Sequence, residues 1–86
     1  MTDQTITVRF FARLREELDT EQLTVPEGNN RTAADLLAML ASQGGPWAQL
    51  QADQPVMIAI NQIMTKPDAP VKAGDEVAFF PPVTGG

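Results

Sequence analysis

Cysteine and histidine are both absent from this sequence of 86 residues. Their absence excludes thiolate nucleophiles, imidazole general bases and metal sites built from these side chains. Pairs of carboxylates remain, but Glu16–Glu17 and Asp75–Glu76 are adjacent in the sequence, and the side chains of neighbouring residues diverge. We interpret both pairs as solvated charges. The sequence therefore predicts a chain with no catalytic residue of its own and no metal site.

Basic residues are scarce and long apolar runs are missing. Lys and Arg total 6 against 11 Asp and Glu, for a net charge of -5. Cations this scattered do not form the basic face that nucleic acids require, whereas the acidic surplus suits either a basic partner surface or simple solubility. No apolar run is long enough to span a membrane, and the opening residues lack the pattern of a signal peptide. We expect a cytoplasmic protein without a nucleic-acid or membrane partner.

The hydrophobic pattern predicts one α+β domain, with a mixed sheet and one main helix on one face of it. Residues 5–11 alternate between two faces, as in a half-buried strand. The expected elements are this strand at 5–11, a helical turn at 12–18, a strand at 21–25, the main helix from Thr32 to Gly44 and Gly45, a further turn at 46–50, a strand at 55–64 with a bend at Asn61 and Gln62, and a closing segment at 69–80 with a turn at Ala73 and Gly74.

The main helix has the clearest signals. Thr32 is suited to cap its first turn, and Asp35, three residues later, completes a capping box. We expect Trp47, in the turn that follows the helix, to pack in or beside the core rather than to hold a ligand. Apolar residues recur at helical spacing and form a stripe that we expect to face the core: Ala33, Leu36, Leu37 and Leu40.

Two aromatic rings have the wrong alternation for the core. Phe11 lies on the face opposite Phe10 in the first strand, and Phe80 lies on the face opposite Phe79 in the last. If these strands are neighbours, the two rings meet outside the core, with Met57 or Met64 beside them. An apolar patch of this kind marks an interface; the alternative is that a ring at a strand end tucks under a loop.

The sequence ends in a predicted tail. Pro81 and Pro82 cannot donate ladder hydrogen bonds, so we place the domain at residues 1–80 and a flexible tail at 81–86. At about 3.3 to 3.6 Å per residue, the tail reaches on the order of 20 Å. Gly85 and Gly86 have no side chains and fit a narrow channel. The α-carboxylate of Gly86 is a poor electrophile, and because the chain has no phosphate-binding loop, another protein must activate it.

Three segments resemble the MoaD family, the ubiquitin-like sulfur carriers that form the small subunit of molybdopterin synthase. VRFFARLRE at 8–16 is similar to the family's opening strand and turn, and AINQIM at 59–64 is similar to its third strand. GDEVAFFPPVTGG at 74–86 is similar to its closing segment and is the most specific match. The middle, 19–55, is generic, and Asp19 stands in a turn where many relatives have glycine.

The resemblance implies a β-grasp fold and a role in sulfur transfer. It implies that a ubiquitin-activating-type enzyme adenylates Gly86 with ATP, that a sulfur-donating enzyme converts it to a thiocarboxylate, and that this chain binds no cofactor. The tail is implied to enter the active site of the large subunit and to give sulfur to cyclic pyranopterin monophosphate, which becomes molybdopterin. The tail that precedes Gly86 consists of Pro81, Pro82, Val83, Thr84 and Gly85. The resemblance assigns the partner interface to Phe11, Met64 and Phe80.

Three other interpretations stay open. The first is a sulfur carrier for thiamine or tRNA thiolation, with the same chemistry at Gly86. The second is a ubiquitin-like modifier whose Gly86 forms isopeptide bonds with lysines. The third is an interaction module with an incidental tail, in which Gly86 has no role.

Overall fold

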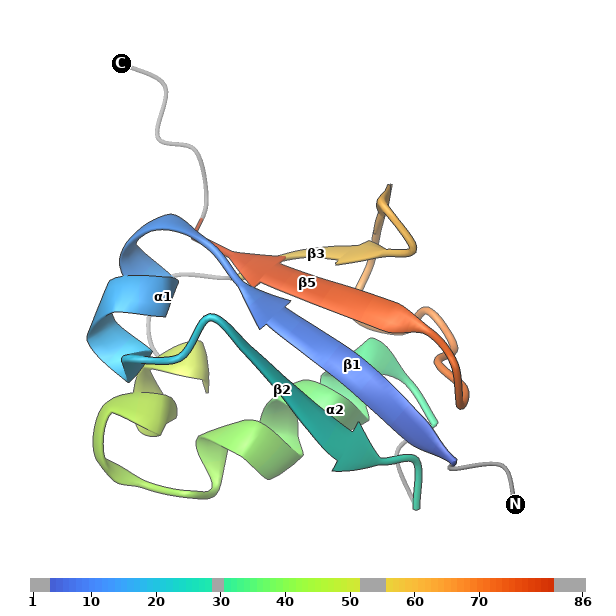
Figure 1. The fold of residues 1–86 in the computed structure, drawn as a ribbon, viewed down its shortest axis with the longest axis horizontal. Helices are drawn as coiled ribbons and strands as arrows, with labels where there is room; N and C mark the ends of the chain where they lie inside the picture. The colour runs from blue at the N-terminus through green and yellow to red at the C-terminus, as the bar shows by residue number, and fades with distance from the viewer. Residues whose placement is uncertain (1–3, 29–30, 52–55, 82–86) are drawn as a thin grey trace.

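The computed structural model describes residues 4–28, 31–51 and 56–81. Helices and strands alternate in the first half of the chain, and strands fill most of the second half (Figure 1). The elements are β1 (Thr5–Phe10), α1 (Ala12–Leu18), β2 (Gln22–Pro26), α2 (Ala33–Ala41), the 3-10 helix η1 (Gly45–Gln51), β3 (Met57–Ile60), β4 (Ile63–Thr65) and β5 (Glu76–Phe80).

The strands form one mixed sheet in the order β2-β1-β5-β3-β4. The first and last strands, β1 and β5, lie side by side and run parallel, while every other pair of neighbours is antiparallel. Helix α2 crosses one face of this sheet (Figure 1). The predicted arrangement, a mixed sheet with one main helix on one face, is therefore confirmed. We call the sheet face opposite α2 the outer face.

The core lies between the sheet and α2. Strands β1 and β5 alternate buried and half-buried residues along their length, as a sheet with one covered face requires. In α2 the predicted stripe is confirmed for three residues, but Leu37 is only half-buried and Ala41 is buried in addition. The largest fully buried side chains are Phe10, Phe79, Ile6, Leu36, Leu40, Leu50, Ile58, Val8 and Val77.

Both predicted features around α2 are present. The amide of Asp35 donates to Thr32 Oγ1 at 3.2 Å, and the amide of Thr32 donates to Asp35 Oδ2 at 3.3 Å, so the capping box is complete. Trp47 in η1 is half-buried and packs against the core, with its ring 5.5 Å from that of Phe10 in an edge contact. The prediction that Trp47 has a packing role is confirmed.

Two predictions are wrong in detail. Residues 55–64 do not form one bent strand, because β3 and β4 pair with each other around a two-residue turn at Asn61 and Gln62. Both turn residues have positive φ, 50° and 70°, which is the geometry that joins two antiparallel strands tightly. Asp75 is not a solvated charge: it is 8% exposed, and its carboxylate accepts from the amide of Lys72 at 2.9 Å and from Asn61 Nδ2 at 3.0 Å.

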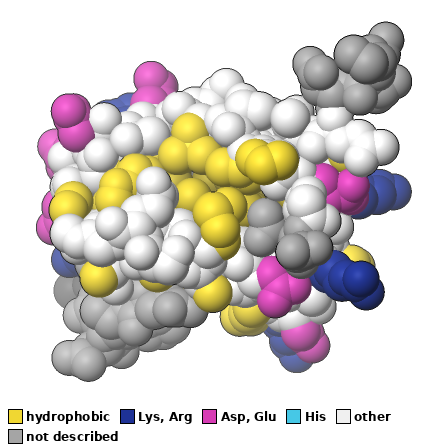
Figure 2. Space-filling model, turned by 90° about the horizontal axis from the view of Figure 1, so that it is seen from below, with side chains coloured by type: hydrophobic (Ala, Val, Ile, Leu, Met, Phe, Trp, Pro, Cys, Tyr) yellow, Lys and Arg dark blue, Asp and Glu magenta, His cyan; other side chains and the backbone are white. Residues whose placement is uncertain are grey.

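The core is not closed on every side. Seen from below the view of Figure 1, hydrophobic side chains form a band across the middle of the molecule (Figure 2). Partly buried hydrophobic residues border the core from β2, α2, η1, β3 and the residue that precedes β3, and they are Leu23, Leu37, Met39, Trp47, Val56 and Ile60. None of the helices in the described segments has the length and apolar character needed to cross a membrane.

Candidate functional site

An apolar patch lies on the outer face where β1 and β5 end. The amide of Phe11 donates to the carbonyl oxygen of Phe79 at 3.2 Å, so the chain follows β5 for one residue beyond β1. The rings of Phe11 and Phe80 are 6.2 Å apart at an interplanar angle of 79°, an edge-to-face contact. Phe11 is 37% exposed. The predicted meeting of these two rings outside the core is confirmed.

Two methionines extend this patch across the sheet. Met57 of β3 lies directly opposite Phe80 of β5, and Met64 of β4 lies opposite Ala59 of β3. Residues that face each other across a ladder share a sheet face, so both methionines lie on the outer face. They are 36% and 53% exposed. We name the set Phe11, Met57, Met64 and Phe80 the outer patch; Met57 is the member beside Phe80, and Met64 lies on the strand beyond.

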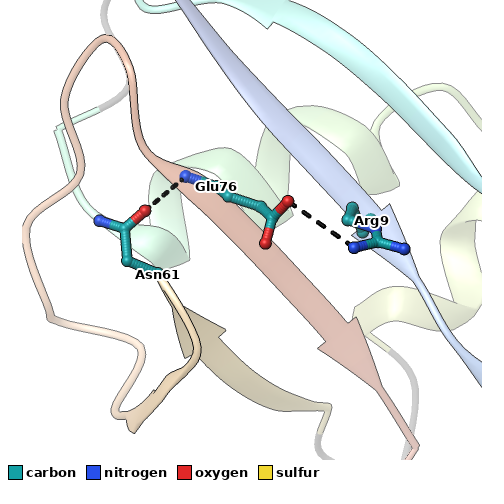
Figure 3. Close-up of polar contacts among 3 residues, drawn as sticks. All are labelled: Arg9, Asn61 and Glu76. Atoms are coloured by element: carbon teal, nitrogen blue, oxygen red, sulfur yellow. Dashed lines mark hydrogen bonds and ion pairs between the residues drawn. The ribbon is translucent and has the colours of Figure 1, made fainter.

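An ion pair borders the outer patch on the side of β1. Glu76 of β5 reaches toward Arg9 of β1, with 3.7 Å between Glu76 Oε2 and Arg9 Nη1 (Figure 3). The guanidinium carbon of Arg9 also lies 5.3 Å from the centre of the Phe11 ring, within the range of a cation–π contact. Asn61 fixes the backbone of Glu76, because the amide of Glu76 donates to Asn61 Oδ1 at 3.0 Å (Figure 3).

The backbone around Phe11 turns sharply. Phe11 is extended, with φ -130° and ψ 158°, and is the N-cap residue of α1. The next residue, Ala12, has a φ of 54°, a left-handed value that residues with a Cβ rarely adopt. Helix α1 ends at Asp19, whose φ of 51° is of the same kind and explains why this turn suits glycine. Phe11 is thus held directly between β1 and α1 rather than on a loop.

The structure describes only the first residue of the predicted tail. Pro81 is half-buried and follows β5 directly. The remaining predicted tail residues, Pro82, Val83, Thr84, Gly85 and Gly86, lie outside the described residues. Their assignment to a tail, and the domain boundary at residue 80, stay predictions.

The sequence matches the ThiS family from residue 8 to residue 86. The chain belongs to the ThiS family. It is also 42% identical to the molybdopterin synthase sulfur carrier subunit of Escherichia coli, over 94% of this chain and 99% of that one. The protein of the same name from Haemophilus influenzae is 40% identical over the same shares. These relatives confirm the resemblance that the three sequence segments indicate.

Solved structures of the same shape support the fold. SAMP1 from Haloferax volcanii superposes with a TM-score of 0.73 at 25% identity, over 95% of this chain and 99% of that one. A second match is a chain from the solved complex of subunits 1 and 2 of the molybdopterin-converting factor from Helicobacter pylori. It superposes with a TM-score of 0.64 at 24% identity, and the match covers 95% of this chain and 99% of that one. This ThiS-family chain therefore has the β-grasp fold that the sequence predicts.

The sequence predicted part of this site and missed part of it. The alternation predicted Phe11 and Phe80, with Met57 or Met64 beside them, and the resemblance then assigned Met64. The ion pair of Arg9 and Glu76 was missed, although both residues share the alternation of the two rings. The signal for this ion pair is the alternation of the two strands. Residues 9 and 11 lie on one side of the chain in the first strand, and residues 76, 78 and 80 lie on one side in the last, so Arg9 and Glu76 share the face of the two rings.

Proposed function

We propose that this ThiS-family chain is the sulfur carrier subunit of molybdopterin synthase, acting in molybdenum cofactor biosynthesis. Two relatives of that name, each at least 40% identical over nearly the whole chain, are the observation that carries the proposal. The geometry supports it, because an exposed apolar patch lies at the end of the strand from which the predicted tail leaves. A carrier of this kind needs a surface for docking and a separate terminus for chemistry.

The chemistry takes place at the carboxylate of Gly86. An α-carboxylate has a reference pKa of about 3.3 to 3.7, so it is ionised near neutral pH and is a poor electrophile. A ubiquitin-activating-type enzyme joins it to the adenylyl group of ATP and releases pyrophosphate. Sulfur at the oxidation level of sulfide, supplied by a sulfur-donating enzyme, then attacks the acyl carbon, so that AMP leaves and a thiocarboxylate forms. In the large subunit the sulfur of the thiocarboxylate bonds to cyclic pyranopterin monophosphate; its bond to the acyl carbon then breaks, and water supplies the oxygen that restores the carboxylate of Gly86.

The outer patch is the surface that docks on the large subunit. Phe11, Met57 and Met64 are each at least a third exposed, and a group of large exposed apolar side chains on one sheet face is typical of an interface. Pro81 has no amide hydrogen and cannot extend the ladder, which ends at Phe80. Docking at the patch would then place the start of the tail at a fixed point. We assign the chain no catalytic residue and place the reaction in the cytoplasm.

Mass spectrometry of the protein purified from its own cell tests the proposal. One carboxylate oxygen replaced by sulfur must be found on the C-terminal fragment. Locating the fragment is essential, because oxidation of a methionine such as Met64 changes the mass by nearly the same amount. Deletion of Gly86 is the matched control: it should abolish the modification and dithiolene formation while leaving affinity for the large subunit unchanged. Unchanged product formation by the truncated chain would refute the proposal.

A second candidate function is that of a protein modifier. SAMP1 from Haloferax volcanii, a small archaeal modifier protein, has the same fold. A modifier would leave Gly86 joined to lysine amines of other proteins. Tagging this chain at its N-terminus and searching for covalent adducts under denaturing conditions separates the two functions. Adducts that vanish with Gly86 deleted would favour the modifier.

A further inference from the structure

Arg9 lies across the outer face rather than extending into solvent. Its guanidinium carbon is 5.3 Å from the centre of the Phe11 ring, and its Nη1 is 3.7 Å from Glu76 Oε2. Both side chains of the ion pair are 36% exposed. The pair therefore continues the outer patch, because Arg9 is in contact with one of the patch's two rings.

The guanidinium has hydrogen-bonding capacity that the free chain does not use. A separation of 3.7 Å is an electrostatic contact but is too long for a hydrogen bond. Arg9 Nε is shut off from solvent and has no hydrogen-bond partner among the described residues. Arginine has five N–H donors, so those that still face water must find another acceptor if a partner covers this face.

Glu76 cannot close the gap to Arg9 by moving its backbone. The amide of Glu76 donates to Asn61 Oδ1 at 3.0 Å, and its carbonyl oxygen accepts from the amide of Asn61 at 2.8 Å. In the parallel ladder Glu76 lies opposite Thr7, while Arg9 lies opposite Ala78, so the two charges face each other diagonally. The ladder and the β3–β4 turn together set the loose spacing of the pair.

The geometry points to the Arg9–Glu76 pair as a specificity-determining element of the docking surface, an inference that rests on the proposed function. On docking, the large subunit covers the pair as a neutral unit, and Arg9 donates to a neutral carbonyl oxygen of that subunit. A carbonyl suits the site better than a carboxylate, because Glu76 already supplies the negative charge and a second carboxylate would repel it. The chain's net charge of -5 points the same way.

Affinity for the large subunit, measured by titration calorimetry on the full chain, tests the inference. We compare Arg9→Met, Glu76→Gln and the double variant. Methionine keeps an apolar stem over Phe11, and glutamine keeps the shape of Glu76. Each single change leaves one charge covered without its counter-charge, so each should weaken binding by about thirtyfold or more. The double variant should lose less affinity than the product of the two single losses, because it again covers no unpaired charge.

The chain provides a matched control pair. Arg13 and Glu17 form an ion pair at 3.8 Å, with side chains 55% and 43% exposed, and both belong to helix α1 rather than to the sheet. Arg13→Met and Glu17→Gln should change the affinity less than twofold. Thermal unfolding of all variants should show little change in Tm, since exposed ion pairs contribute little to stability.

Two outcomes would overturn the inference. If Arg9→Met and Glu76→Gln bind as well as the control variants, the pair stays in solvent at the rim of the interface. If the losses of affinity in the two single variants simply multiply in the double variant, the large subunit does not cover the pair as a unit. Phe80→Ala separates this failure from failure of the proposed function. If Phe80→Ala weakens binding while the charge variants do not, only the inference about the pair is wrong.

Discussion

Two consecutive phenylalanines lie at the end of β1 and of β5: Phe10 ends β1 and Phe11 follows it, while Phe79 and Phe80 are the last two residues of β5. The two members of each doublet should have opposite roles. Phe10 is 1% exposed and Phe79 is 0% exposed, and both belong to the core. Phe11 and Phe80 meet on the outer face. Truncation of Phe10 or Phe79 to alanine should therefore reduce stability, and truncation of Phe11 or Phe80 should reduce docking.

The expected magnitudes differ enough to be separated. Phe10→Ala removes a fully buried ring and should cost about 3 to 5 kcal/mol, a large part of the roughly 5 to 15 kcal/mol that holds a domain together. Phe11→Ala loses an edge contact of about 0.5 to 1.5 kcal/mol and a cation–π contact of about 0.5 to 1 kcal/mol. If Phe11 is an interface anchor, the same change should cost about 2 kcal/mol or more in binding, roughly thirtyfold in affinity.

Urea unfolding and calorimetric titration with the large subunit measure the two effects. Trp47 is the only tryptophan of the sequence and its ring is 5.5 Å from that of Phe10, so its fluorescence reports on the core. Circular dichroism provides a second probe, because Phe10→Ala alters the surroundings of Trp47 itself. Binding is measured at low temperature, where the weaker variants are still folded.

The reasoning fails if the doublets do not separate in this way. One result would place all four rings in the core. Phe11→Ala and Phe80→Ala would lose as much stability as Phe10→Ala and Phe79→Ala, and their folded fraction would bind the large subunit normally. The edge contact of Phe11 and Phe80 would then have no docking role.

Two further predictions concern stability. Leu36 is fully buried and Leu37 is only half-buried. Leu36→Ala should therefore lower the free energy of unfolding by about 2 to 5 kcal/mol, and Leu37→Ala should lower it clearly less. Equal losses in urea unfolding would mean that α2 is rotated relative to the sheet. Asp75→Ala should cost about 1 to 3 kcal/mol, because the amide of Lys72 and Nδ2 of Asn61 lose their acceptor, and unchanged stability would show that water replaces the carboxylate.

Local sequence signals predicted most of the fold. The capping box of Thr32 and Asp35 depends on residues three positions apart, and the alternation of β1 and β5 depends on neighbours. The position of Phe11 and Phe80 followed from the same alternation once the two strands were assumed to be adjacent. Signals of this kind involve only a few consecutive residues, so one sequence is enough to interpret them.

The errors came from contacts between distant segments. In residues 55–64 the apolar pattern continues on both sides of Asn61 and Gln62. A single bent strand and a hairpin predict nearly the same alternation for this segment, so the pattern does not distinguish them. The buried state of Asp75 depends on Asn61, fourteen residues earlier in the chain. Leu37 has the helical spacing of a core residue, but its exposure depends on how far the sheet extends over α2. None of these contacts is visible in local spacing.

Strand β5 links the fold to the proposed chemistry within a few residues. Val77 and Phe79 are in the core, Phe80 is on the outer patch, and Pro81 ends the ladder. A sulfur carrier must place one carbonyl carbon in a distant active site, where an error of about 1 Å can cost a hundredfold in rate. The position of Pro81, where the predicted tail begins, depends on the position of Phe80. The position of Phe80 depends in turn on the packing of Phe79 in the core. Sulfur transfer should therefore be sensitive to changes at Phe79 that leave the outer patch chemically intact.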